Sequence, residues 1–118
     1  MFKSTATRAR LVIPSALLAV CAGAIAVIES PAQAKPREHV VVMSNMSFGR
    51  VPADAKVGDT ILWVNRDSVP HSVTARNRSF DIRTSAGQSR RLRLTRAGVY
   101  QLYCIYHPAM RGTLRVSQ

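Results

Sequence analysis

Cysteine is scarce in this sequence, and its scarcity excludes one common way of stabilising a small exported domain. The chain has two cysteines in 118 residues, Cys21 and Cys104. Cys21 lies in an N-terminal segment that we expect to be removed, so Cys104 has no partner in the remaining chain. A disulfide framework is therefore excluded, and Cys104 is left as an intermolecular partner, a reactive thiol or a metal ligand. The sequence contains no Cys-x-x-Cys-His, which excludes covalently attached haem.

Acidic residues are also few. Six Asp and Glu stand against 17 Lys and Arg, which gives a net charge of +11. A basic surface suits nucleic acid, an anionic membrane or an acidic protein partner, or it simply keeps a small domain soluble. Export of the chain, together with the lack of any helix-turn-helix, zinc-finger or RNA-binding motif, argues against nucleic acid. Because most arginines of the second half lie between residues 76 and 96, we expect one strongly cationic side.

The first 34 residues are typical of a secretory signal peptide. A basic start is followed by an apolar run over 11–28 and by Ala32-Gln33-Ala34, so we expect cleavage after Ala34 and a periplasmic location. The alternative is an uncleaved membrane anchor, since about 20 apolar residues span a bilayer. Residues 35–118 then form one domain.

Short β-branched and alternating runs separated by turns fill this domain. The expected strands cover 40–43, 60–65, 73–75, 80–83, 89–95, 99–104 and 112–116. No repeat or amphipathic helix interrupts them. The pattern predicts an all-β fold, a β-sandwich of about seven or eight short strands, with Trp63 in its core and Cys104 facing inward.

Four side chains form the candidate metal site. Cys104, His107 and Met110 lie within seven residues of one another, and His71 lies 33 residues before Cys104. Imidazole with soft sulfur ligands selects copper, and two histidines, one cysteine and a weak axial methionine are typical of a blue-copper electron-transfer centre. Zinc is less suitable because closed zinc sites rarely use methionine. A Cys–His hydrolase would need an orienting third group, which the loop does not offer.

The chain resembles the cupredoxins, type 1 blue copper proteins, and within them the amicyanin-like small copper proteins. The resemblance runs over most of 38–118 and is carried by residues 57–60, 63–71, 98–100, 104–110 and 112–113. The short His107-x2-Met110 spacing is the amicyanin-like feature. The resemblance implies a Greek-key sandwich and one copper ion held by His71, Cys104 and His107, with Met110 axial.

It also implies the function. The expected activity is one-electron transfer between Cu(I) and Cu(II), without an enzymatic reaction, by a monomer that meets redox partner proteins such as a c-type cytochrome or a periplasmic dehydrogenase near His107. Two alternatives stay open. One is a non-redox copper carrier or store of the cell envelope, and the other is a subunit of a copper enzyme, for which three histidines are too few unless another chain adds ligands.

Two departures from the family pattern affect the surroundings of Cys104. Ser72 follows the first ligand, and Ile105, which has no side-chain donor, follows the cysteine, so the expected hydrogen bonds between the two segments are in doubt. Tyr106 replaces a proline, and we expect its N–H to reach the thiolate and raise the reduction potential.

Overall fold

The computed structural model describes residues 10, 12, 14–16, 22–28 and 34–118. The chain divides into two units, 1–32 and 33–118. Most of the expected signal peptide, including Cys21, lies outside the described residues. In the parts of the chain that are described, no helix is long and apolar enough to cross a membrane.

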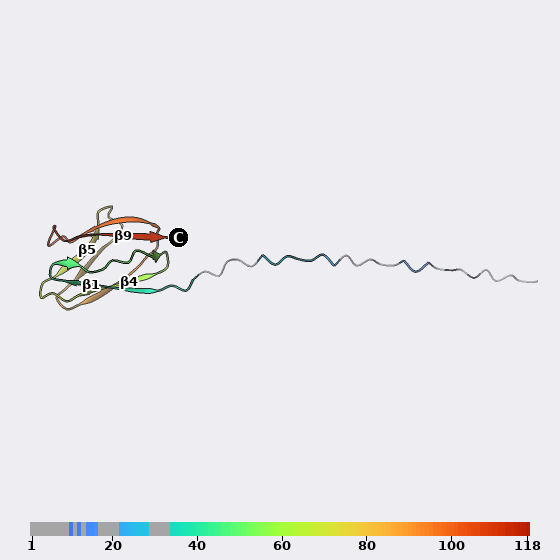
Figure 1. The fold of residues 1–118 in the computed structure, drawn as a ribbon, viewed down its shortest axis with the longest axis horizontal. Helices are drawn as coiled ribbons and strands as arrows, with labels where there is room; N and C mark the ends of the chain where they lie inside the picture. Colours follow the sequence, from blue (N-terminus) through green and yellow to red (C-terminus); the bar gives the residue numbers. More distant parts are fainter. Residues whose placement is uncertain (1–9, 11, 13, 17–21, 29–33) are drawn as a thin grey trace, which may run out of the picture. The chain divides into compact units, whose positions relative to one another are not determined.

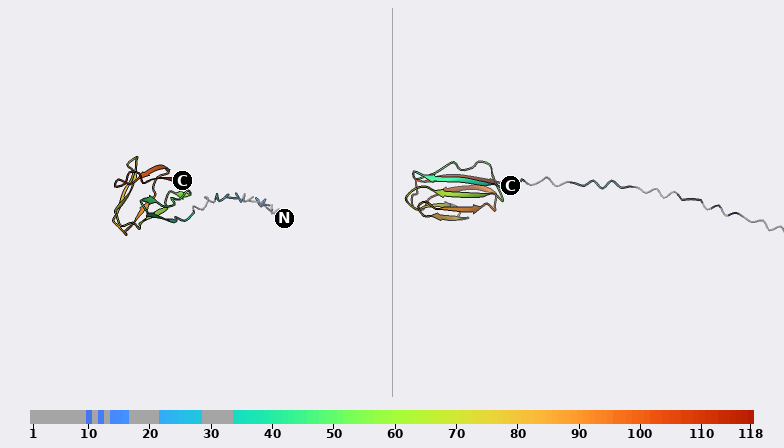
Figure 2. Two further views of the ribbon diagram at one scale, coloured as in Figure 1. Left: turned by 60° about the vertical axis from the view of Figure 1, so that its left-hand side comes forward. Right: turned by 90° about the horizontal axis from the view of Figure 1, so that it is seen from below.

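The second unit consists of two β-sheets. One sheet has the strand order β2-β1-β4-β7 and the other β3-β9-β8-β5-β6, and Figure 1 shows them as two layers, with β1 and β4 in one and β5 and β9 in the other. Figure 2 shows the strands of this unit running alongside one another. The strands are β1 (Glu38–Ser44), β2 (Ser47–Phe48), β3 (Ala55–Lys56), β4 (Thr60–Asn65), β5 (His71–Ala75), β6 (Asp81–Thr84), β7 (Ser89–Arg93), β8 (Gly98–Tyr103) and β9 (Arg111–Ser117).

The predicted all-β sandwich is confirmed. Each of the seven expected strands is present, with ends that move by one or two residues except in β4, whose bounds agree, because turn residues fix strand ends less sharply than alternation fixes strand centres. Two further strands, β2 and β3, bring the number in the described residues to nine. Both are two residues long and are too short to carry any periodicity.

Alternating residues of the two sheets fill the space between them. Trp63 is fully buried, as predicted, and its ring meets Phe48 edge-on at 6.0 Å. On β8 and just beyond it, Tyr100, Leu102 and Cys104 all face inward, which confirms the predicted inward side of this strand. Packing of these side chains provides most of the stability of such a domain.

Strand direction explains how distant residues meet at one end of the sandwich. β5 and β8 run antiparallel, with Thr74 opposite Tyr103. The start of β5, at His71, is therefore next to the end of β8, immediately before Cys104. The loop 104–110 returns the chain to β9, so His107 and Met110 belong to the same end of the fold.

Candidate metal centre

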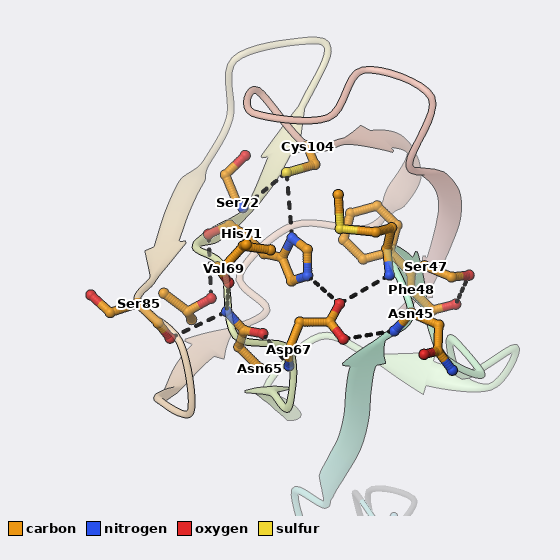
Figure 3. Close-up of polar contacts among 12 residues, drawn as sticks. Asn45, Ser47, Phe48, Asn65, Asp67, Val69, His71, Ser72, Ser85 and Cys104 are labelled. Atoms are coloured by element: carbon orange, nitrogen blue, oxygen red, sulfur yellow. Dashed lines mark hydrogen bonds and ion pairs between the residues drawn. The ribbon is translucent and has the colours of Figure 1, made fainter.

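His71 and Cys104 form the centre of the site. Both side chains are fully buried. The Cys104 Sγ atom lies 4.0 Å from His71 Nδ1, and the two atoms face each other in Figure 3. A thiol and an imidazole nitrogen at this distance can bind one soft metal ion between them, with release of the thiol proton.

Asp67 fixes which nitrogen of His71 is available. The carboxylate Oδ2 lies 2.7 Å from His71 Nε2 and accepts a hydrogen bond from it. Hydrogen bonds, first from the N–H of Met46 and then from His71, hold the pKa of Asp67 below its usual value, so it is a carboxylate at neutral pH. Because Nε2 carries the hydrogen, Nδ1 presents its lone pair to Cys104, as a carboxylate behind a ligating histidine generally ensures.

The same carboxylate holds the turn between β1 and β2. The N–H groups of Asn45 and Met46 donate to Asp67 over 2.8 and 2.9 Å. Both residues have positive φ angles, 52° and 59°. Left-handed backbone is uncommon for a methionine, and the two hydrogen bonds offset part of its cost. Asp67 thus joins this hairpin to the back of His71.

Ser72 joins the two ligand segments in a way that the sequence did not predict. Its N–H donates to Cys104 Sγ over 3.3 Å, and its Oγ accepts from the N–H of Ile105 over 2.8 Å. The hydrogen bonds between the two segments, which the sequence left in doubt, are formed, because the backbone N–H of Ile105 replaces its missing side-chain donor. The hydrogen bond expected from Tyr106 N–H to the sulfur is not formed among the described residues, where Ser72 supplies the N–H to Sγ.

The loop after Cys104 is closed by its own backbone. Cys104 N–H donates to the carbonyl of Met110, and Met110 N–H donates to the carbonyl of His107. Met110 is 3% exposed and belongs to the hydrophobic core. The His107 ring lies edge-on to the His71 ring with a centroid separation of 5.3 Å. All four predicted ligands therefore lie at one end of the sandwich.

Of the four predicted ligands, His71 and Cys104 are the pair whose sulfur and nitrogen atoms lie close together. Within the described residues, no group of three or more His, Cys, Asp or Glu side chains is gathered closely enough to hold a metal ion. His107 has a buried ring nitrogen, Nε2, without a hydrogen-bond partner. A buried polar atom normally has a partner, and a soft cation beside His71 and Cys104 would satisfy it. The residues present therefore fit a copper ion, with His107 as the ligand that must adjust.

His39 lies outside this site. Its Nε2 is 2.8 Å from Asp59 Oδ2, and it sits early in β1. Burial raises the pKa of Asp59, but hydrogen bonds from Arg37 N–H, His39 and Lys56 N–H outweigh it and lower the pKa from 3.8 to about 2. His39 was not among the four predicted ligands, and the sequence did not indicate Asp59 as its partner. A histidine facing an aspartate is structural here.

These features define a class of protein: a small β-sandwich with a buried cysteine and histidine at one end, suited to a soft metal ion. The family described as copper binding proteins of the plastocyanin/azurin family matches residues 38–117. The chain belongs to this family, which confirms the predicted cupredoxin resemblance and makes it a copper-binding cupredoxin.

Relatives agree with this assignment. The chain is 34% identical to an amicyanin of Paracoccus denitrificans over 83 residues, 65% of this chain and 63% of the relative, so the match spans less than two thirds of that protein. It is 30% identical to an amicyanin of Paracoccus versutus over 88 residues, 69% of this chain and 67% of the relative. A solved structure of the reduced state of an amicyanin mutant is 33% identical, with a TM-score of 0.58 over 67% of this chain and 81% of the other.

Proposed function

We propose that the protein is a type 1 copper electron carrier whose ligands are His71, Cys104 and His107, with Met110 as the weak axial ligand. The observation that carries the proposal is the buried Cys104 sulfur facing the lone pair of His71 Nδ1. Bound copper would supply one-electron exchange between Cu(I) and Cu(II). No substrate is transformed, in keeping with membership of a family of electron carriers that are not enzymes.

The protein's own groups keep the site rigid during electron exchange. Asp67 orients His71, and Ser72 N–H donates to the cysteine sulfur. A hydrogen bond to a thiolate stabilises its negative charge and so disperses charge that the metal would otherwise receive. Solved amicyanin mutants include both oxidised and Cu(I) forms, which is the pair of states that this role requires.

Partners and location are part of the proposal. Redox proteins with acidic surfaces, such as a c-type cytochrome or a periplasmic dehydrogenase, suit the domain after Ala34, whose 14 Lys and Arg against five Asp and Glu give a net charge of +9. Of the four ligands, His71 and Cys104 are fully buried and Met110 is 3% exposed, whereas His107 is half-buried. His107 is therefore the ligand that offers electrons a way out. Cleavage after Ala34 would release the domain as a monomer into the periplasm.

A copper carrier or store is the second candidate, and burial of the site argues against it. A protein that delivers metal must let a recipient ligand reach the ion, and three of the four side chains have 3% exposure or less. The two functions differ in a measurable rate. A carrier releases copper to a competing chelator quickly, whereas an electron-transfer site retains copper while it is reduced and reoxidised.

The visible spectrum of the copper-loaded protein tests the proposal. We expect an intense thiolate-to-copper band with Cu(II) that disappears with reductant and returns on oxidation. Cys104→Ser should abolish this band, because the hydroxyl does not supply the soft anionic ligand. His39→Gln is the matched control, since His39 contacts Asp59 and not the site, and it should keep the band. An unchanged band in Cys104→Ser would overturn the assignment of the ligands.

A further inference from the structure

Two buried hydroxyl groups on β5 connect the ligand loop to the surface of the protein. Ser72 is fully buried and Thr74 is 8% exposed. The Oγ of Ser72 and the Oγ1 of Thr74 are 2.9 Å apart. Thr74 Oγ1 in turn lies 3.0 Å from Oδ1 of Asp81, on the neighbouring strand β6. A buried hydroxyl that lacks a partner is costly, so each hydrogen in this series must be used.

Counting hydrogens gives the series a single direction. A hydrogen bond from Arg83 holds the pKa of Asp81 below its usual value, so Asp81 is a carboxylate and accepts from Thr74. A threonine hydroxyl has one hydrogen, so Thr74 must accept from Ser72. Ser72 Oγ, with its own hydrogen used, is the acceptor for Ile105 N–H at 2.8 Å.

We propose that Asp81 is a positioning residue for the loop that carries Cys104, His107 and Met110, acting through Thr74 and Ser72. Ile105 directly follows Cys104, so the last hydrogen bond of the series fixes the peptide beside the sulfur. Aligned hydrogen bonds polarise one another, so an acceptor at position 81 strengthens the hydrogen bond from Ile105 N–H to Ser72. The functional consequence rests on the proposed copper site, but every bond in the series is formed by protein groups alone.

Amide hydrogen exchange of Ile105 in the metal-free protein, measured by NMR, tests this role. Thr74→Val leaves the buried hydroxyl of Ser72 without its acceptor, and Asp81→Ala removes the end of the series. We expect roughly fivefold faster exchange at Ile105 in each, about the net worth of one hydrogen bond. Thr113→Val is the matched control, because Thr113 is an exposed residue of β9 that bonds only Gln101 in this sheet. Its Ile105 exchange should equal that of the parent protein.

Asp81→Asn keeps a hydrogen-bond acceptor for Thr74 but removes the negative charge of the carboxylate. The amide oxygen still accepts from Thr74, so parent-like exchange is expected, and exchange as fast as in Asp81→Ala would overturn the proposal. Unchanged exchange in both Thr74→Val and Asp81→Ala would also overturn it. Since the Asp81 side chain is 42% exposed, its variants keep the test open if Thr74→Val does not fold.

The rate of copper loss to a chelator tests whether this series of hydrogen bonds affects the proposed copper site. We expect Asp81→Ala to lose copper several-fold faster than Asp81→Asn and Thr113→Val. Faster Ile105 exchange with unchanged copper loss would overturn the positioning role. A protein that takes up no copper would instead overturn the proposed function, and the exchange result would stand.

Discussion

Asp59 is expected to control the acid stability of the domain. It is 3% exposed, and its carboxylate accepts hydrogen bonds from Arg37 N–H at 2.9 Å, from Lys56 N–H at 3.0 Å and from His39 Nε2 at 2.8 Å. These bonds join the start of β1 to the turn before β4, at residues that the copper site does not use. Removing the charge should therefore change stability without changing the ligands.

The pKa of Asp59 gives the magnitude. Its fall from 3.8 to about 2 in the folded protein corresponds to a contribution of about 2 kcal/mol to the free energy of unfolding. Because the folded pKa is the lower one, the contribution is fully present above the unfolded pKa, near pH 4. It is lost as the pH falls through the folded pKa, near pH 2.

Urea unfolding of the metal-free protein, followed by the fluorescence of the fully buried Trp63, measures this contribution. At pH 6 we expect Asp59→Asn to lower the free energy of unfolding by about 2 kcal/mol. Between pH 4 and pH 2 its stability should fall less steeply than that of the parent protein, so that the two converge. Asp54→Asn is the control, because the Asp54 side chain is 70% exposed. If the free energies of unfolding of the parent protein and Asp59→Asn differ by the same amount at pH 6 and at pH 2, the reasoning is refuted.

Two backbone predictions concern the hairpin before the site. Met46→Gly should raise the free energy of unfolding by roughly 1 kcal/mol, because Met46 has a φ of 59° and is 44% exposed, so the change relieves a left-handed conformation with little loss of packing; Met43→Gly, in the fully buried core, should destabilise instead. Gly49→Ala should lower the free energy of unfolding by about 2 kcal/mol, since the new methyl group would overlap the carbonyl oxygen of Val42. Denaturation midpoints measure both, and a neutral Gly49→Ala would show that the chain can shift there.

Alternation was sufficient to predict most of the fold. Strand β7 and the residue after it show why: Arg91 and Arg93 are exposed while Leu92 and Leu94 face inward, as the two-residue period requires. Strands β2 and β3 were missed because two residues contain no period. The parallel pairing of β1 with β4 was not predicted either, since pairing depends on which crossovers the sandwich permits.

The four candidate ligands were proposed from residue type and spacing, whereas the residues that hydrogen-bond to them were not predicted. Cys104, His107 and Met110 share one loop, so their proximity follows directly from their spacing in the sequence. Asp67 gave a weaker signal, an acidic residue four positions before His71 in a turn. The family pattern places hydrogen bonds between the segments of Ser72 and Ile105, but it did not indicate that Ser72 would accept from the backbone N–H of Ile105, because that hydrogen bond depends on the register between β5 and the end of β8.

The hydrogen bonds that hold the candidate ligands determine how far each one should move when the metal gains or loses an electron. His71 is held by Asp67, Cys104 by Ser72, and Met110 by the carbonyl of His107, all without the help of a metal ion. A ligand that is already held by protein contacts moves little when an electron arrives or leaves, which is the condition for rapid exchange. Of the four proposed ligands, all within the described part of the chain, His107 is the one with a buried ring nitrogen, Nε2, that lacks a hydrogen-bond partner, so it is free to adjust. We therefore expect any rearrangement between the two oxidation states of the proposed copper site to be confined to His107, the side chain that we propose as the access point for partners.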